Sequence, residues 1–70
     1  MYEKNLNSKF MGVANGYEIY RCEARIYDEY KDKFVGKIKV YYDVCLPDGG
    51  DIVFSGKTWK AAIKYTVENR

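Results

Sequence analysis

The chain has 70 residues, 47% of them hydrophobic, and its 12 basic and 10 acidic side chains give a formal charge of +2. This length fits one small domain, and the apolar content excludes a disordered chain. The mixed charges do not by themselves indicate a nucleic-acid module, and no apolar run is long enough to span a membrane. With two cysteines and no apolar signal core, the sequence predicts a soluble protein of a reducing cytoplasm, in a bacterial or host cell, which includes a virus-encoded protein.

The chain begins with a polar stretch, "MYEKNLNS", for which we predict a weakly ordered N-terminal segment over residues 1–8, followed by a single domain over 9–70. Two runs with strand character come next, separated by Asn15-Gly16. This dipeptide is typical of a type I′ turn, in which both central residues have positive φ. The pattern therefore predicts a hairpin of strands Lys9–Ala14 and Tyr17–Tyr27.

The second strand of this hairpin alternates between two sets of side chains. A two-residue turn places Met11 opposite Tyr20 and Val13 opposite Glu18. One set is expected to face the core: Tyr20, Cys22, Ala24 and Ile26. The other set is expected on the outer face: Tyr17, Ile19, Arg21, Glu23, Arg25 and Tyr27.

A polar loop, Asp28 to Lys33, precedes the clearest signal in the sequence, the run "FVGKIKVYYDVCL". Alternation along this run argues against a helix and predicts a long strand. Its apolar face is expected to point to the core: Phe34, Gly36, Ile38, Val40, Tyr42, Val44 and Leu46. "PDGG" then predicts a turn, and Asp51–Ser55 a short strand with Ile52 and Phe54 inward, or with Val53 in exchange if the turn adds a bulge.

The final segment changes period, because apolar residues recur at helical spacing from Trp59 to Val67. Ser55 or Thr58 can cap the start of this helix. The apolar stripe of the helix and the apolar face of the sheet can bury only each other. The sequence thus predicts an α+β fold: an antiparallel β-meander of about four strands (β-β-β-β-α) with one C-terminal helix packed on one face.

Residues Ser55 to Ile63, "SGKTWKAAI", contain the Gly-Lys-Thr that ends a phosphate-binding loop. The first glycine of that motif is missing, since Asp51 stands at its position and strand residues fill the loop. We therefore interpret the stretch as a strand-to-helix junction in which Gly56 eases the turn. A free helix N-terminus beside Lys57 would attract an anion only weakly.

The residue types that most catalytic chemistry needs are missing. The chain has no histidine, which removes the commonest general base and most zinc ligand sets. By strand parity Cys22 faces inward and Cys45 outward, so no disulfide is expected between them. The acidic residues gather in turns without the spacing of a calcium loop. We therefore expect a protein without enzyme activity, with no catalytic residue, no cofactor and no metal.

The sheet face that the helix leaves uncovered is the candidate functional surface. Tyrosine and arginine are enriched where proteins dock, and the same residues with lysine can bind nucleic acid. The predicted partner-binding surface consists of Tyr17, Ile19, Arg21, Arg25, Tyr27, Lys37, Lys39 and Tyr41. An ordinary solvated sheet surface is the alternative interpretation of the same residues.

Interleaved acidic residues, among them Glu18, Glu23 and Asp43, would repel phosphates and favour a protein over nucleic acid as the partner. The sequence thus predicts a small protein-binding module, an adaptor or inhibitor of the kind that phages and other mobile elements encode. Two alternatives stay open: a nucleic-acid-binding module that uses the same face, and a homodimer through this face or a sheet edge.

Overall fold

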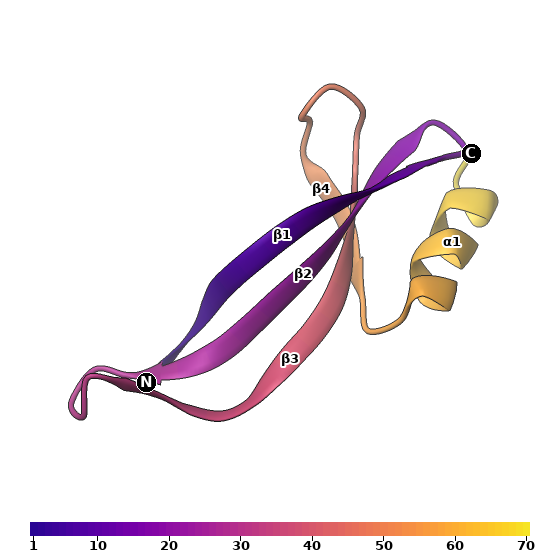
Figure 1. The fold of residues 1–70 in the computed structure, drawn as a ribbon. Coiled ribbons are helices and arrows are strands. Elements are labelled where there is room, and N and C mark those ends of the chain that lie inside the picture. Colours follow the sequence, from indigo (N-terminus) through magenta and orange to yellow (C-terminus); the bar gives the residue numbers. More distant parts are fainter.

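The fold is one antiparallel sheet followed by one helix (Figure 1). The computed structural model describes all residues from 1 to 70. Its elements are the strands β1 (Tyr2–Ala14), β2 (Tyr17–Asp28), β3 (Lys33–Cys45) and β4 (Ile52–Gly56) and the helix α1 (Trp59–Glu68). The strands lie in the order β1-β2-β3-β4, so each pairs with its neighbour in sequence. The predicted α+β class and four-stranded meander are confirmed.

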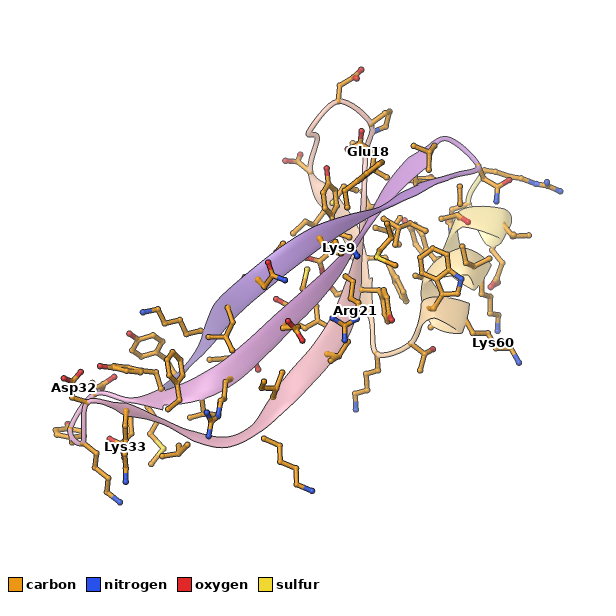
Figure 2. All side chains as sticks on the ribbon, viewed as in Figure 1. Lys9, Glu18, Arg21, Asp32, Lys33 and Lys60 are labelled. Atoms are coloured by element: carbon orange, nitrogen blue, oxygen red, sulfur yellow. The ribbon has the colours of Figure 1, made fainter.

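The molecule is elongated, with extents of 44 × 22 × 16 Å. Strands β1 to β3 have 12 or 13 residues each, whereas β4 has 5 and α1 has 10. The two short elements lie at the same end of the sheet (Figure 1). Asp32 and Lys33 mark the other end, far from Lys60 on the helix (Figure 2). The helix therefore covers one end of one sheet face, and the distal part of the sheet has no second layer.

The β1–β2 hairpin is longer than the sequence predicts. Strand β1 begins at Tyr2, which lies opposite Tyr27 with the two ring centres 5.7 Å apart. The residues predicted as a separate N-terminal segment therefore extend the hairpin to the distal end of the sheet. At the turn, Asn15 and Gly16 have φ values of 50° and 86°, as the predicted type I′ turn requires.

The register of this hairpin is confirmed near the turn and changes farther along β1. Val13 lies opposite Glu18, as predicted. A bulge at Met11 then shifts the pairing, so Phe10 and not Met11 lies opposite Tyr20. The predicted Met11–Tyr20 pair is wrong because a bulge inserts one residue that the alternation does not count.

The apolar core lies between α1 and the end of the sheet. Ile19 of β2, Val44 of β3 and Ala62 of α1 are fully buried and form its centre. Partly buried side chains pack around them: Ala14, Tyr17, Tyr42, Phe54, Ile63 and Tyr65. The ring of Phe54 stacks on that of Tyr65 with 4.8 Å between the centres. Aromatic rings thus supply much of the apolar area that this small core buries.

The start of α1 is fixed by a cap and a close approach. Thr58 is the N-cap, and its hydroxyl accepts a hydrogen bond of 3.1 Å from the backbone N–H of Ala61, which confirms one of the two predicted caps. Gly56 ends β4 where a Cβ atom would lie 2.8 Å from the Phe54 ring and 3.2 Å from the Cβ of Ala61. The missing side chain lets the helix turn back onto the sheet.

The end of α1 is tied to the β1–β2 hairpin. The Asn15 Nδ2 donates to the Oγ1 of Thr66 at 3.1 Å, and the Tyr17 hydroxyl donates to the carbonyl oxygen of Asn69 at 2.6 Å. Both donors stand at the turn, so the helix is held at both of its ends over the same end of the sheet. Figure 1 shows the C-terminus beside this turn.

The two faces of β2 are the reverse of the prediction. Ile19 is fully buried against the helix and Tyr17 packs beside it, so their predicted place on the outer face is wrong. The residues predicted to face the core lie on the other side of the strand: Tyr20, Cys22, Ala24 and Ile26. Cys22 and Ala24 are nevertheless buried there, as predicted, with exposures of 2% and 1%. A helix of this length spans about 15 Å and the strands span about 40 Å. Only the start of β2 therefore needs apolar side chains under the helix. Farther along the same face the strand is not covered, so it can carry the charged residues Arg21 and Glu23.

The apolar face of β3 is predicted correctly only where the helix covers it. Val44 and Tyr42 belong to the core, as expected. Ile38 is 54% exposed and Leu46 is 42% exposed, so placing these two inside is wrong. Ile38 lies in a distal, irregular stretch of β3 near Gly36, which has a φ of 78°. No second layer reaches that part of the sheet.

The two residues of β4 that were predicted to point inward lie on opposite faces of the sheet, because the strand contains a bulge, which the sequence analysis allowed for as an alternative. Phe54 lies opposite Val44 and packs on the core, as predicted. A bulge at Val53 puts Ile52 opposite Cys45 instead, on the face away from the helix. The predicted inward position of Ile52, which is 59% exposed, is therefore wrong.

Replacing Ile19 and Ile38 one at a time tests this arrangement. The alternation in the sequence predicts Ile19 outside and Ile38 in the core, whereas in the structure Ile19 is buried and Ile38 is exposed. Ile19→Ala should lower the free energy of unfolding by about 2–5 kcal/mol, and Ile19→Val by about 0.5–1.5 kcal/mol. Ile38→Ala should change it by less than about 0.5 kcal/mol. Urea unfolding followed by circular dichroism measures all three, and a larger loss for Ile38→Ala than for Ile19→Ala would contradict the structure.

Candidate functional site: the face opposite the helix

The sheet face away from α1, called here the open face, is built from five cross-strand rows of side chains, the most distal of which holds Glu3, Ile26 and Val35. Residues paired across strands point to the same face, and successive residues along a strand point to opposite faces. The open-face rows are therefore those whose side chains point away from the side of Ile19 and Val44. The other four rows are Val13, Glu18, Cys45 and Ile52; Phe10, Tyr20, Asp43 and Ser55; Ser8, Cys22 and Tyr41; and Asn5, Ala24 and Lys39. No element of the chain covers this face (Figure 1).

The structure divides the predicted partner-binding surface. Lys39 and Tyr41 lie on the open face, while Lys37 is exposed in the irregular stretch of β3. The other members lie on the helix side of β2, two of them under the helix and three beyond it: Tyr17, Ile19, Arg21, Arg25 and Tyr27. The eight residues therefore do not form one surface.

The distal residues of the divided set form a separate cluster on the helix side of the sheet. The ring of Tyr27 meets that of Phe34 edge-on at 5.2 Å, and the Arg25 guanidinium lies 6.0 Å from the Phe34 ring. The hydroxyl of Tyr27 donates to Asp32, which raises the pKa of Tyr27 above its ordinary value. These contacts are internal to the sheet and fix the β2–β3 turn.

A polar network crosses all four strands on the open face. The Asn5 Nδ2 donates to the Tyr41 hydroxyl at 3.1 Å and to the Ser8 hydroxyl at 3.3 Å. The Ser8 hydroxyl donates to the Cys22 sulfur at 3.5 Å, and the Cys22 thiol donates to Oδ2 of Asp43 at 3.5 Å. The network ends on Asp43, whose Oδ1 accepts from the hydroxyl of Ser55 in β4.

Asp43 differs from the chain's other buried carboxylate. Asp43 is only 9% exposed, and none of the four ion pairs of the chain includes it. Asp28 is 3% exposed, but its Oδ1 accepts from the backbone N–H groups of Tyr30 and Lys31 and so shapes the β2–β3 turn. The burial of Asp28 has a structural reason, whereas Asp43 faces an open hollow and has only uncharged partners.

This hollow on the open face has a volume of about 420 Å³. Its lining includes two carboxylates, two lysines and two hydroxyls, from Glu3, Asp43, Lys39, Lys57, Tyr41 and Ser55. The Lys39 Nζ lies 3.3 Å from Oε2 of Glu3, so these two charges satisfy each other. Asp43 and Lys57 are the charges in the hollow without an ion pair.

The two cysteines lie on the open face rather than on opposite faces, and both are free. The prediction that Cys45 faces outward holds in direction, but Cys45 is buried, and Cys22 is buried on that same side. Burial raises the pKa of both thiols, and the nearby Asp43 carboxylate raises both further. The neutral thiol of Cys22 is therefore the form that donates to Asp43.

The aromatic part of the open face lies beside the network. Phe10 packs on Tyr20 with 5.5 Å between the ring centres, and the Tyr20 hydroxyl donates to Oε1 of Glu18 at 3.0 Å. This hydrogen bond to a carboxylate is the main cause of the raised pKa of Tyr20. The sequence assigned Tyr20 to the core and gave Phe10 no role. The length of the β2–β3 turn could have shown this. With four residues between Asp28 and Lys33, even-numbered residues of β2 share a face with odd-numbered residues of β3, so Tyr20 lies beside Asp43 and not on the face of Val44.

No protein-family model matches this chain, and comparison with curated proteins and with solved structures finds no match either. Helix α1 lacks the length and the apolar character that a helix needs to cross a membrane.

The buried thiols predict that stability depends on pH. Because folding raises the thiol pKa values above about 8.5, the thiol contribution is complete below that pH and is lost as the pH rises through the folded-state values. The urea concentration at the midpoint of unfolding should therefore decrease when the pH is raised from about 7.5 to about 9.5. In the double variant Cys22→Ala, Cys45→Ala the fall should be smaller, whatever the variant's stability at pH 7.5. An equal fall in both proteins would show that other groups cause it.

Proposed function

We propose that the chain is a small non-enzymatic protein-binding module, an adaptor or inhibitor, that docks on another protein through the open face. The observation that carries this proposal is the exposure of large apolar side chains on a face without a second layer. Phe10 is 52% exposed, Val13 65% and Ile52 59%. Docked proteins bury such side chains at the centre of an interface and surround them with polar groups.

The small core supports the same proposal. Only 9 of the 70 residues are buried, and the apolar cluster under the helix has three fully buried members. Domains of this size have little apolar burial to offset the entropy of folding. A partner on the open face would bury a second apolar area and stabilise the fold by mass action.

Several basic side chains of the predicted surface are already engaged, which favours a protein over nucleic acid. Arg21 lies 3.4 Å from Glu23, and Lys39 lies 3.3 Å from Glu3. The Arg25 Nε donates to the carbonyl oxygen of Gly36 at 2.7 Å. The open face also carries the Glu18 and Asp43 carboxylates, which would repel phosphates.

Docking through the face is also favoured over pairing through the free edge of β1. Bulges at Leu6 and Met11 interrupt that edge, and Lys4 and Lys9 add charge along it. Bulges and lysines are the features by which edge strands avoid pairing with other strands. The two free cysteines support a reducing compartment such as the cytoplasm for this protein.

Capture of the partner by surface variants tests the proposal. Phe10→Ser with Ile52→Ser should remove at least about 90% of the captured partner, because two central apolar contacts of about 1–2 kcal/mol each are lost. The matched control is Ile38→Ser with Val67→Ser, which changes equally exposed residues elsewhere on the chain. Affinity purification from the native cell with mass spectrometry, with and without nuclease, measures both.

The outcomes separate the alternatives. Capture that survives the open-face variant would reject the open face, and loss in the control alone would place the contact elsewhere on the chain. Loss of the captured protein on nuclease treatment, together with a steep fall of affinity with salt, would replace a protein partner by nucleic acid. Light scattering that shows a dimer of the wild type and a monomer of the open-face variant would make the partner a second copy of the chain.

A further inference from the structure

We infer that the hollow around Asp43 receives an arginine side chain of the docked protein. This inference rests on the proposed docking through the open face and specifies its chemistry. It begins from a buried charge: Asp43 is 9% exposed, and its only partners, Ser55 and Cys22, are uncharged. A buried carboxylate ordinarily has a cationic partner or several hydrogen bonds from backbone N–H groups. Asp43 has neither within the chain.

The hydrogen bonds that Asp43 already accepts define what it can still bind. An ionised carboxylate has about four acceptor positions on its two oxygens. Ser55 uses one position on Oδ1, and Cys22 uses one on Oδ2. One position remains on each oxygen, and two parallel N–H groups of a guanidinium match such a pair. An ammonium group would fill these positions less completely because it is a point charge.

The walls of the hollow fit the same ligand. The volume of about 420 Å³ leaves room for a long side chain, and falls in the range of roughly 300–1,000 Å³ of small-molecule sites. Tyr41 lines the hollow, and a guanidinium plane packs well on an aromatic ring. Ile52 also lines the hollow and belongs to the exposed apolar group, so the hollow lies inside the proposed interface. Lys39 is neutralised by Glu3, which leaves Lys57 as the opposing charge at the hollow.

The occupant comes from a different protein rather than from a second copy of this chain. The chain has three arginines: Arg21 and Arg25 lie on the helix side of β2, and Arg70 follows α1, so none stands in a row of the open face. In a two-fold dimer through this face, both copies would present the same surface to each other. Such a dimer would bring two Asp43 hollows into one interface and no arginine to fill them.

A small arginine compound tests the inference with the free protein. N-acetyl-arginine-amide, titrated into the ¹⁵N-labelled chain, should give saturable amide shifts at Asp43, Ser55 and Gly56 with a Kd on the order of millimolar. N-acetyl-citrulline-amide has nearly the same shape without the charge and should bind at least about tenfold more weakly, since charge-assisted hydrogen bonds are lost. This comparison needs no variant and does not depend on the identity of the partner.

A charge-removing variant gives the second arm. Asp43→Asn should weaken arginine binding at least about tenfold, while Asp48→Asn, the same change in an exposed turn, should leave it unchanged. Absence of saturable shifts, equal binding of the citrulline compound, or unchanged binding by Asp43→Asn would each overturn the inference. If the arginine compound fails but the open-face variant still loses the partner, docking stands and only the role of the hollow is rejected.

Discussion

The fold depends on one contact, the burial of Ala62 of α1 against Ile19 and Val44 at the end of the sheet. This contact brings together the helix, the hairpin and β3, and hydrogen bonds from Asn15 and Tyr17 hold the helix end above it. Because the helix has 10 residues, it cannot cover strands of 12 or 13 residues. Most of the sheet is therefore held by strand pairing and cross-strand side chains alone.

The chain has only one helix, so the sheet face opposite α1 has no second layer. In a fold with a second helical layer, the positions of Asp43, Ser8 and Ser55 would be expected to carry apolar residues. They carry instead a polar network that ends on a buried carboxylate, beside exposed apolar side chains such as Ile52. A surface of this composition suits a partner that brings both an apolar area and a directed charge, which gives specificity as well as affinity.

The sequence predicted the elements better than their faces. Asn15-Gly16 strongly favours the positive φ values of a type I′ turn, so the turn was predicted correctly. The start of the helix was also predicted correctly, because Thr58 precedes a clear helical stripe of apolar residues. The faces of β2 were not, because small, aromatic and charged residues alternate there without a dominant apolar side. Bulges at Met11 and Val53 move residues between faces and leave no mark in a two-residue period. Of the predicted surface, Lys39 and Tyr41 lie on the open face, whereas the surroundings of Asp43 depend on Cys22 and Ser55, which meet it only in the folded sheet.

The contact between the helix and the sheet is open to direct measurement in solution. Nuclear Overhauser effects between methyl groups of a ¹³C-labelled sample report which side chains lie within about 5–6 Å of one another, the distance of packed neighbours. The structure predicts strong effects from the Ala62 methyl to those of Ile19 and Val44, and none from α1 to Ile38. Effects from the Ala62 methyl to the Ala24 methyl, with none between the Ile19 methyls and the helix, would place α1 on the other face and contradict the account.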